Sequence, residues 1–206
     1  MRRPAAIHWT PSYDSHMKHL LITMALLCSG LSAQPLAGDA LVRALQQGGY
    51  VILMRHTSSP NTVPAGATER QLDEEGRTSA TAMGKALRDL KIPIGEVYSS
   101  PTYRALETVK YAQFGTAIAT PELGDNGVSM SGGTAAQAEW LQKRVAQSPK
   151  GTNIILVTHM PNLRGAFPAQ AANVADGEAL IFGPGPTLVA RVKAEEWKTL
   201  HTEPRP

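Results

Sequence analysis

Two apolar runs that each end in a histidine constrain the fold of this chain most. The first, residues 51–56, reads Val-Ile-Leu-Met-Arg-His, and the second, residues 154–159, reads Ile-Ile-Leu-Val-Thr-His. Short continuous runs of aliphatic residues are typical of buried strands, and the carboxyl ends of parallel strands meet at one edge of a sheet. We therefore expect His56 and His159 to lie at the same edge, with Arg55 beside the first imidazole.

These residue types favour chemistry on an anion. An imidazole can act as nucleophile, base or metal ligand near neutral pH. The guanidinium of Arg55 offers a planar fork of donors that matches a phosphate or a carboxylate.

The rest of the chain alternates between helical and extended patterns. Apolar residues at three- and four-residue steps, with capping residues and prolines at their ends, predict helices over 40–47, 73–92, 101–112 and 134–148. Further short strands are predicted over 96–99, 116–119, 179–182 and 187–192. This alternation predicts an α/β fold, a three-layer α/β/α sandwich with a mostly parallel sheet and an antiparallel edge from the tail. The loop over 58–68 follows the Arg-His pair and is long enough to be functional.

The first 33 residues carry the pattern of a signal peptide. Basic residues at 18–19 are followed by an apolar run over 20–27 and by small residues that end at Ala33. The apolar run is too short to span a bilayer, so we expect cleavage after Ala33, no stable membrane insertion, and a periplasmic or secreted protein. The alternative is a membrane-retained anchor or a lipoprotein attached through Cys28. The predicted organisation is an N-terminal extension and signal peptide over 1–33 and a single domain over 34–206.

Charge and cysteine content narrow the function classes. The whole chain has a formal net charge of only +3, and basic and acidic residues nearly balance after residue 33, which gives no support for a nucleic-acid surface. The single cysteine, Cys28, lies in the predicted signal peptide. The mature domain is therefore expected to fold without a disulfide.

A third segment joins the two histidine runs. Residues 99–108 read Ser-Ser-Pro-Thr-Tyr-Arg-Ala-Leu-Glu-Thr, which predicts a strand exit followed by the start of a helix. The amino terminus of a helix attracts anions through its free N–H groups and its partial positive charge. Arg104 lies at this position, so Arg55, Arg104, His56 and His159 are expected to converge on one pocket.

The three motifs, in this order, resemble those of the histidine phosphatase superfamily, branch 1, which has the phosphoglycerate mutase-like fold. The resemblance extends from about Tyr50 to Phe182. It implies a metal-independent phosphatase without a cofactor, in which His56 attacks phosphorus and Arg55, Arg104 and His159 hold the phosphoryl oxygens. Phosphoryl transfer depends mainly on positioning and charge stabilisation, which agrees with this set of side chains.

Two further groups of residues are candidates for the site. Hydroxyl and amide groups just after His56 are expected to bind the substrate phosphate, namely Thr57, Ser58 and Asn61. The resemblance also implies a carboxylate that protonates the leaving oxygen. Asp125 is the first candidate, and Glu122 and Glu178 follow and are counted among the substrate-binding residues. Other cations are interpreted as solvated surface residues, namely Arg70, Arg77 and Arg164.

The sequence thus predicts an exported phosphatase that hydrolyses a small phosphorylated substrate through a phosphohistidine on His56. The resemblance, together with the predicted export, implies an envelope sugar phosphate as the substrate class, such as a heptose phosphate of the lipopolysaccharide core. One alternative is a non-catalytic phosphate- or phosphoprotein-binding module on the same fold. The other is a phosphohistidine protein phosphatase or a mutase, which requires a cytoplasmic protein.

Overall fold

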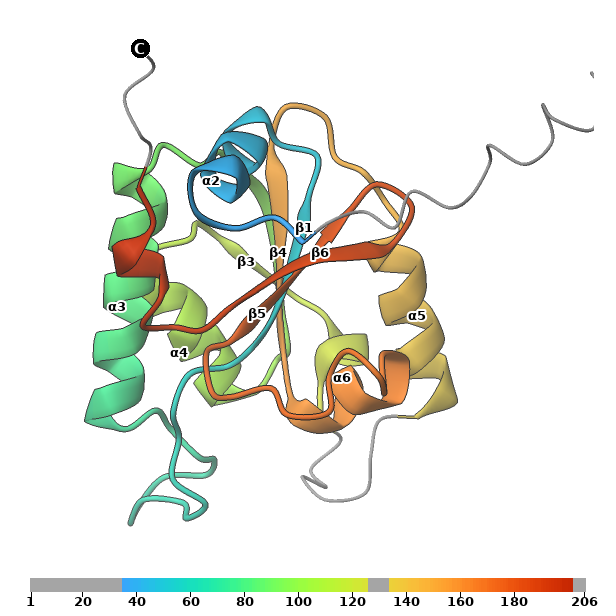
Figure 1. The fold of residues 1–206 in the computed structure, drawn as a ribbon. Helices are drawn as coiled ribbons and strands as arrows, with labels where there is room; N and C mark the ends of the chain where they lie inside the picture. The colour runs from blue at the N-terminus through green and yellow to red at the C-terminus, as the bar shows by residue number, and fades with distance from the viewer. Residues whose placement is uncertain (1–34, 126–133, 202–206) are drawn as a thin grey trace, which may run out of the picture. The chain divides into compact units, whose positions relative to one another are not determined.

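The computed structural model of the protein describes residues 35–125 and 134–201 (Figure 1). These residues belong to the second of two compact units, Met1–Ala33 and Gln34–Pro206. The predicted extension and signal peptide over 1–33 lie outside the described residues. Within the described ranges, no helix is both long and apolar enough to cross a bilayer.

A mixed sheet forms the centre of this unit. Its strands are β1 (Val51–Arg55), β2 (Ile94–Ser99), β3 (Ala117–Ala119), β4 (Asn153–Thr158), β5 (Ala179–Gly183) and β6 (Thr187–Val192), in the order β3-β2-β4-β1-β5-β6. The pairs β2–β3, β2–β4 and β1–β4 are parallel, and β5 is antiparallel to both β1 and β6. The predicted fold class and the predicted antiparallel tail are confirmed.

Helices cover both faces of the sheet. They are α2 (Gly38–Gln47), α3 (Glu74–Asp89), α4 (Tyr103–Ala112), α5 (Ala135–Val145) and α6 (Met160–Ala166), with short 3-10 helices η1 (Pro121–Leu123) and η2 (Trp197–Thr199). Figure 1 shows α3 and α4 on one side and α5 and α6 on the other. Because successive side chains of a strand point to opposite faces, Ile52 packs in the core under α3 and α4, whereas Leu53 packs in the core under α5 and α6.

Local sequence explains where the main helices begin. Asp73 caps α3 by accepting a hydrogen bond from the backbone N–H of Gly76 at 2.7 Å. Thr134 and Gln137 form a capping box at the start of α5. Gly76 also permits a close approach of the preceding loop, since a Cβ atom there would lie 2.1 Å from the carbonyl oxygen of Ser58. The loop after His56 is therefore fastened to the start of α3.

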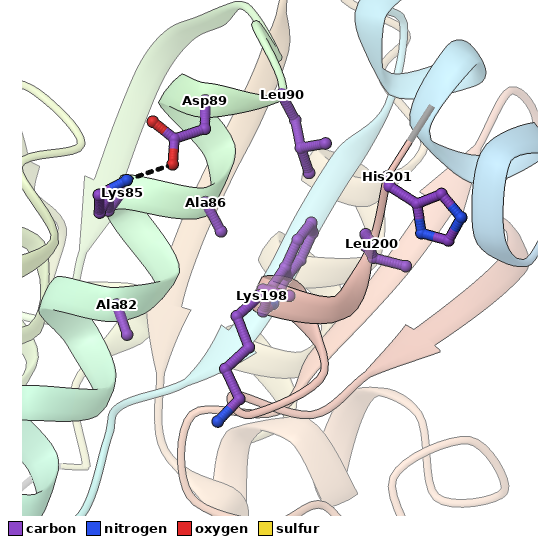
Figure 2. A pocket seen from close by; sticks show the side chains of 9 residues that line it. Ala82, Lys85, Ala86, Asp89, Leu90, Lys198, Leu200 and His201 are labelled. Carbon is purple, nitrogen blue, oxygen red and sulfur yellow. Dashed lines mark hydrogen bonds and ion pairs between the residues drawn. The ribbon is translucent and has the colours of Figure 1, made fainter. Parts of the chain in front are cut away.

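A surface pocket of about 490 Å³ lies between α3 and the C-terminal segment that contains η2 (Figure 2). Lys85, Asp89 and Leu90 line it from α3 and the turn that follows, and Trp197, Lys198 and His201 line it from the C-terminal segment. None of the predicted site residues lines this pocket.

Candidate active site

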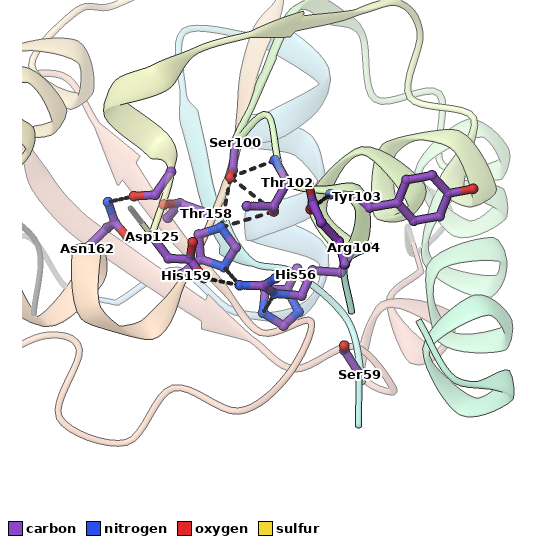
Figure 3. Close-up of polar contacts among 12 residues, drawn as sticks. His56, Ser59, Ser100, Thr102, Tyr103, Arg104, Asp125, Thr158, His159 and Asn162 are labelled. Carbon is purple, nitrogen blue, oxygen red and sulfur yellow. Dashed lines mark hydrogen bonds and ion pairs between the residues drawn. The ribbon is translucent and has the colours of Figure 1, made fainter. Parts of the chain in front are cut away.

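Three parallel neighbouring strands deliver the predicted motifs to one edge of the sheet. His56 directly follows β1, Ser100 follows β2, and His159 follows β4. Arg55 is paired with Thr158 in the register of β1 and β4, so the two histidines are neighbours across this strand pair. The backbone N–H of His56 continues the ladder by donating to the carbonyl of Thr158 at 3.0 Å. Figure 3 shows His56, His159 and Arg104 gathered at this edge.

The imidazole of His56 is held in one tautomer. Its Nδ1 lies 2.8 Å from the carbonyl oxygen of Thr57, and its Nε2 lies 3.3 Å from Nε of Arg104. A guanidinium can only donate, so Nε2 of His56 accepts and Nδ1 carries the proton. The ring is 4% exposed. A neutral, oriented imidazole with a free lone pair on Nε2 is the form that a nucleophile requires.

His159 has the opposite tautomer. Its Nδ1 lies 3.2 Å from Nη2 of Arg104 and therefore accepts, which places the proton on Nε2. That nitrogen lies 2.8 Å from Oγ of Ser100 and 3.2 Å from Oγ1 of Thr102. The rings of His56 and His159 are 5.1 Å apart, centre to centre. The hydroxyls that follow β2 thus orient the second imidazole.

The surroundings keep both imidazoles neutral. Burial lowers the pKa of His56 well below its usual value, and the charges of His159, Arg104 and Arg55 lower it further, against the hydrogen bond to Thr57. Burial and then the charge of Arg104 lower the pKa of His159 to about 3, with Asp125 acting in the opposite direction. Both rings are therefore unprotonated at neutral pH.

Arg104 is the centre of the arrangement. It lies in the first turn of α4, whose apolar side is formed by Ala105, Val109 and Ala112. Its side chain is almost fully buried and bridges both histidines, and Nη2 also forms an ion pair with Asp125. One guanidinium therefore connects the His56 imidazole, the His159 imidazole and a carboxylate.

Arg55 is held by the loop that precedes β5. Its Nη2 lies 2.7 Å from Oδ1 of Asp176, and its Nη1 donates to the carbonyl of Val174 at 3.3 Å. The charge of Arg55, like that of Arg104, lowers the pKa of both His56 and His159. The structure thus brings all four predicted nitrogen-bearing side chains to one site.

The predicted substrate-binding hydroxyls are engaged elsewhere. The hydroxyl of Thr57 lies 3.2 Å from that of Thr108, and the hydroxyl of Ser58 donates to Asp73 at 2.7 Å. Asn61 is exposed, and within the described residues no hydrogen bond joins it to the site. The hydroxyls of Thr57 and Ser58 therefore fix the loop after His56. A polar loop composition alone does not distinguish these two roles.

Among the candidate acids, Asp125 alone contacts the histidine–arginine cluster in the described residues. Its carboxylate is 8% exposed and pairs with Arg104. Three side chains fix the segment before it by donating to carbonyl groups: Thr158 to Leu123 at 2.8 Å, Gln137 to Gly124 at 2.8 Å and Asn162 to Gly124 at 2.9 Å. This network holds the approach to Asp125 in place.

Glu122 and Glu178 lie in other surroundings. Glu122 is half-buried in η1, and its contact with Asn162 uses its backbone carbonyl. The carboxylate of Glu178 accepts from Nε of Arg191 at 2.7 Å and from the backbone N–H of Ala175 at 2.8 Å. Glu178 thus fastens the loop that carries Asp176 to β6. The sequence does not indicate this partner, because Arg191 lies on β6 and comes close to Glu178 only when β5 and β6 pair.

Sequence reasoning missed several residues around the site. Ser100 and Thr102 fall within the Ser-Ser-Pro-Thr-Tyr-Arg motif, so their places could have been read from it. Asp176 stands in a loop without any pattern that could have identified it. Arg70 was interpreted as a solvated cation, yet it is half-buried and close enough to Arg104 and Arg55 for their charges to lower its pKa, after burial.

The other two arginines have local roles. Arg77 is paired with Glu74 on α3 and donates to the carbonyl of Leu72 at 2.7 Å. Arg164 donates to the carbonyl of Ala172 at 3.3 Å on an exposed surface. In the part of the chain that the structure describes, no group of three or more His, Cys, Asp or Glu side chains is placed to hold a metal ion.

Comparisons with known proteins agree with this geometry. Residues 51–125 match the family model of the histidine phosphatase superfamily (branch 1). Similar solved structures include the protein histidine phosphatase SixA complexed with tungstate (TM-score 0.53, 19% identity, 70% of this chain and 97% of that chain). They also include a SixA protein from Agrobacterium tumefaciens (TM-score 0.54, 16% identity, 70% of this chain and 97% of that chain). The comparison with curated proteins gave no match.

The matched segment begins at β1 and ends at Asp125, so it contains the Arg-His pair, the Arg104 motif and the ion-paired carboxylate. The solved structures share the fold. Over residues 51–125 the chain is therefore similar to the histidine phosphatase superfamily (branch 1), and its fold is similar to that of these solved structures.

Proposed function

We propose that the protein is an exported phosphatase that hydrolyses a phosphomonoester through a phosphohistidine on His56. The observation that carries this proposal is the state of the His56 imidazole. Its Nδ1 donates to Thr57, which leaves the lone pair of Nε2 directed at the guanidinium of Arg104. A phosphoryl group bound by that guanidinium lies next to the nucleophilic nitrogen.

In the first step, Nε2 of His56 forms a bond to phosphorus as the bond from phosphorus to the leaving oxygen breaks. Arg104 and Arg55 stabilise the charge on the peripheral oxygens. The hydroxyl of Ser100 donates to Thr102 and accepts from Nε2 of His159. His159 therefore keeps its acceptor Nδ1 directed at Arg104 and helps to hold that guanidinium in place.

Asp125 supplies the proton that the leaving oxygen takes up. In the free protein its carboxylate pairs with Arg104. A phosphate dianion bound to Arg104 competes for the same donors and frees the carboxylate to take up a proton. In the second step, water attacks phosphorus, the bond to Nε2 breaks, and Asp125 accepts the proton from water, so that inorganic phosphate is released.

Trapping of the covalent intermediate tests this mechanism. The protein is mixed with a ³²P-labelled aryl phosphate, quenched in alkali, in which a phosphorus–nitrogen bond survives, and digested for peptide mapping. We expect label on the peptide that contains His56, no label in His56→Ala, and normal labelling in the control His201→Ala, which changes an exposed histidine. A His56→Ala variant that hydrolyses the aryl phosphate at the wild-type rate would refute the covalent mechanism. A wild-type protein that binds tungstate but shows neither label nor turnover would support the non-catalytic binding module.

An envelope sugar phosphate is the substrate class that we propose, and it depends on export. Support for export comes from the basic, apolar and small residues over 17–33. Fractionation of cells that express the tagged full chain tests it, and N-terminal sequencing of the periplasmic form should give Gln34 first. Recovery of an unprocessed protein in the cytoplasm would contradict export and the sugar phosphate together.

A phosphohistidine protein substrate is the second candidate. The fold is similar to that of the protein histidine phosphatase SixA. The ion pair between Asp125 and Arg104 also favours a leaving group that needs little help from an acid. Parallel assays with heptose phosphate and with a phosphohistidine peptide separate the two candidates by their kcat/KM values.

A further inference from the structure

The loop between β1 and α3 is fastened to α4 on both sides of Arg70. The carboxylate of Glu69 accepts a hydrogen bond from the backbone N–H of Tyr103 at 2.9 Å. The backbone N–H of Leu72 donates to Oε2 of the buried Glu107, also at 2.9 Å. These two contacts lie on either side of Arg104 in the sequence of α4. Arg70 is therefore held over the helical turn that carries the central arginine of the site.

The side chain of Arg70 is half-buried and lacks an assigned role in the fold. Its Nε is shielded from solvent and has no hydrogen-bond partner within the described residues. Burial and then the charge of Arg104 lower its pKa; Asp125 and Asp176 act in the opposite direction, and Arg55 adds to the lowering. Arg70 thus lies within electrostatic range of both ion pairs of the site.

The other two arginines of the site are each matched by a carboxylate. Arg55 pairs with Asp176, and Arg104 pairs with Asp125. No ion pair of Arg70 is found in the described part of the chain. Since both histidines are neutral, three guanidiniums face two carboxylates, and the excess positive charge belongs to Arg70. A group that brings negative charge and several acceptor oxygens would satisfy it.

We propose that Arg70 is a third arginine ligand of the phosphoryl group, which donates to a peripheral oxygen from the loop side while Arg104 donates from the helix side. This inference rests on the proposed phosphatase function. A phosphoryl dianion has three peripheral oxygens, and three guanidiniums from β1, α4 and the intervening loop can each take one. Arg70 binds the anion in substrate, transition state and product alike, so its loss weakens binding more than it slows the chemical step.

Variants of Arg70 test this assignment. We expect Arg70→Ala to raise KM for an aryl phosphate and the inhibition constants of inorganic phosphate and tungstate by about 10-fold to 100-fold, with kcat changed by less than about 5-fold. Arg70→Lys keeps the charge but loses the planar fork of donors. Its KM and inhibition constants should therefore lie between those of the wild type and those of Arg70→Ala. Arg43→Ala is the matched control, because it removes a partly exposed arginine from α2, and it should change none of these constants.

A second readout separates direct contact from a structural role. Added guanidinium ion should restore tight phosphate binding to Arg70→Ala, because it replaces the missing group, and should leave Arg43→Ala unchanged. Unchanged inhibition constants in Arg70→Ala would overturn the inference, and so would a loss that guanidinium does not rescue in a variant with wild-type thermal stability. If Arg70→Ala does not fold, Arg70→Gln takes its place in the same assays.

A wrong assignment of Arg70 can be distinguished from a failure of the proposed phosphatase function. Binding of tungstate is also measured by calorimetry, which needs no turnover. A wild-type protein that binds tungstate but neither hydrolyses nor becomes labelled contradicts the phosphatase mechanism, and the comparison of tungstate affinities still decides the role of Arg70.

Discussion

The hydroxyl groups of Thr57 and Thr108 lie 3.2 Å apart and join the residue after His56 to helix α4. Thr108 also accepts from the backbone N–H of Thr57 at 3.2 Å and donates to the carbonyl of Arg104 at 2.9 Å. The single hydroxyl proton of Thr108 is thus used, so Thr57 is the donor between the two hydroxyls. Two hydrogen bonds therefore connect Thr57, the residue directly after His56, to the helix that carries Arg104.

Replacement of Thr108 by valine should destabilise the fold and reduce activity. Thr108→Val leaves two buried donors on Thr57 without their acceptor, which costs about 2 kcal/mol in the free energy of unfolding. Urea unfolding measures this, and kcat should fall as His56 and Arg104 lose their fixed relation. Thr81→Val is the matched control, because Thr81 makes the same bond to the carbonyl four residues earlier but is exposed. If Thr108→Val and Thr81→Val changed stability and kcat equally, the proposed link between Thr57 and α4 would be contradicted.

Loss of the Asp125 carboxylate should depend on the leaving group. Asp125→Asn cannot protonate the leaving oxygen, so hydrolysis of an alkyl phosphate should fall by about 100-fold or more, whereas an activated aryl phosphate needs little protonation and should lose less than about 10-fold. The ratio of the two kcat/KM values is the measurement. Glu122→Gln serves as the control. A uniform loss on both substrates would assign Asp125 a role in holding Arg104 only.

Stability should fall when the solution is acidified below the usual histidine pKa. The pKa of His159 is lowered from 6.5 to about 3, and that of His56 is lowered as well, so the native state stays unprotonated there while the unfolded state binds protons. Stability is thus complete above about pH 6.5 and declines toward about pH 3. Between about pH 7 and pH 5, His159 should remove about 2 kcal/mol from the free energy of unfolding, and His56 should act in the same direction.

The control for this pH dependence is a protein without the two buried imidazoles. Unfolding by urea at the two pH values should show a smaller difference in the double variant His56→Gln/His159→Gln than in the wild type. His201→Gln, which changes an exposed side chain, should keep the wild-type difference. An identical difference in all three proteins would show that the native state does not lower the pKa values of the two buried histidines.

Glu178 should prove structural. Its carboxylate holds Arg191 and the N–H of Ala175, so Glu178→Gln should lower the free energy of unfolding by about 1–3 kcal/mol and should not change the preference for leaving groups. Urea unfolding and the pair of phosphate substrates described for Asp125 measure both effects. A selective loss on the alkyl phosphate would instead make Glu178 an acid of the reaction.

Local pattern predicted most of the architecture. Strand ends at His56 and His159 followed from short apolar runs, and the starts of α3 and α5 followed from their capping residues. Helix α6 was not predicted, because Met160–Ala166 is short and has a proline in its first turn. Its start at the end of β4 depends on tertiary packing, and the sequence pattern alone does not show that.

The site could be predicted where the motif itself carries the chemistry and not where distant segments meet. Arg55, Arg104 and both histidines belong to strand ends that a parallel sheet must bring together. The ion pair of Arg55 with Asp176 joins residues far apart in the chain. The pair of Glu178 with Arg191 depends on how β5 and β6 pair across their turn. The hydroxyls of Thr57 and Ser58 could not be assigned because their contacts depend on tertiary packing: Thr108 lies on α4, and Asp73 is the cap of α3.

The spacing between the two imidazoles is set by main-chain hydrogen bonds of one parallel strand pair. Side chains of the exposed loop tip over 60–67 take no part in that spacing. On the proposed function, a combinatorial library restricted to the tip should therefore keep the parent's affinity for free phosphate.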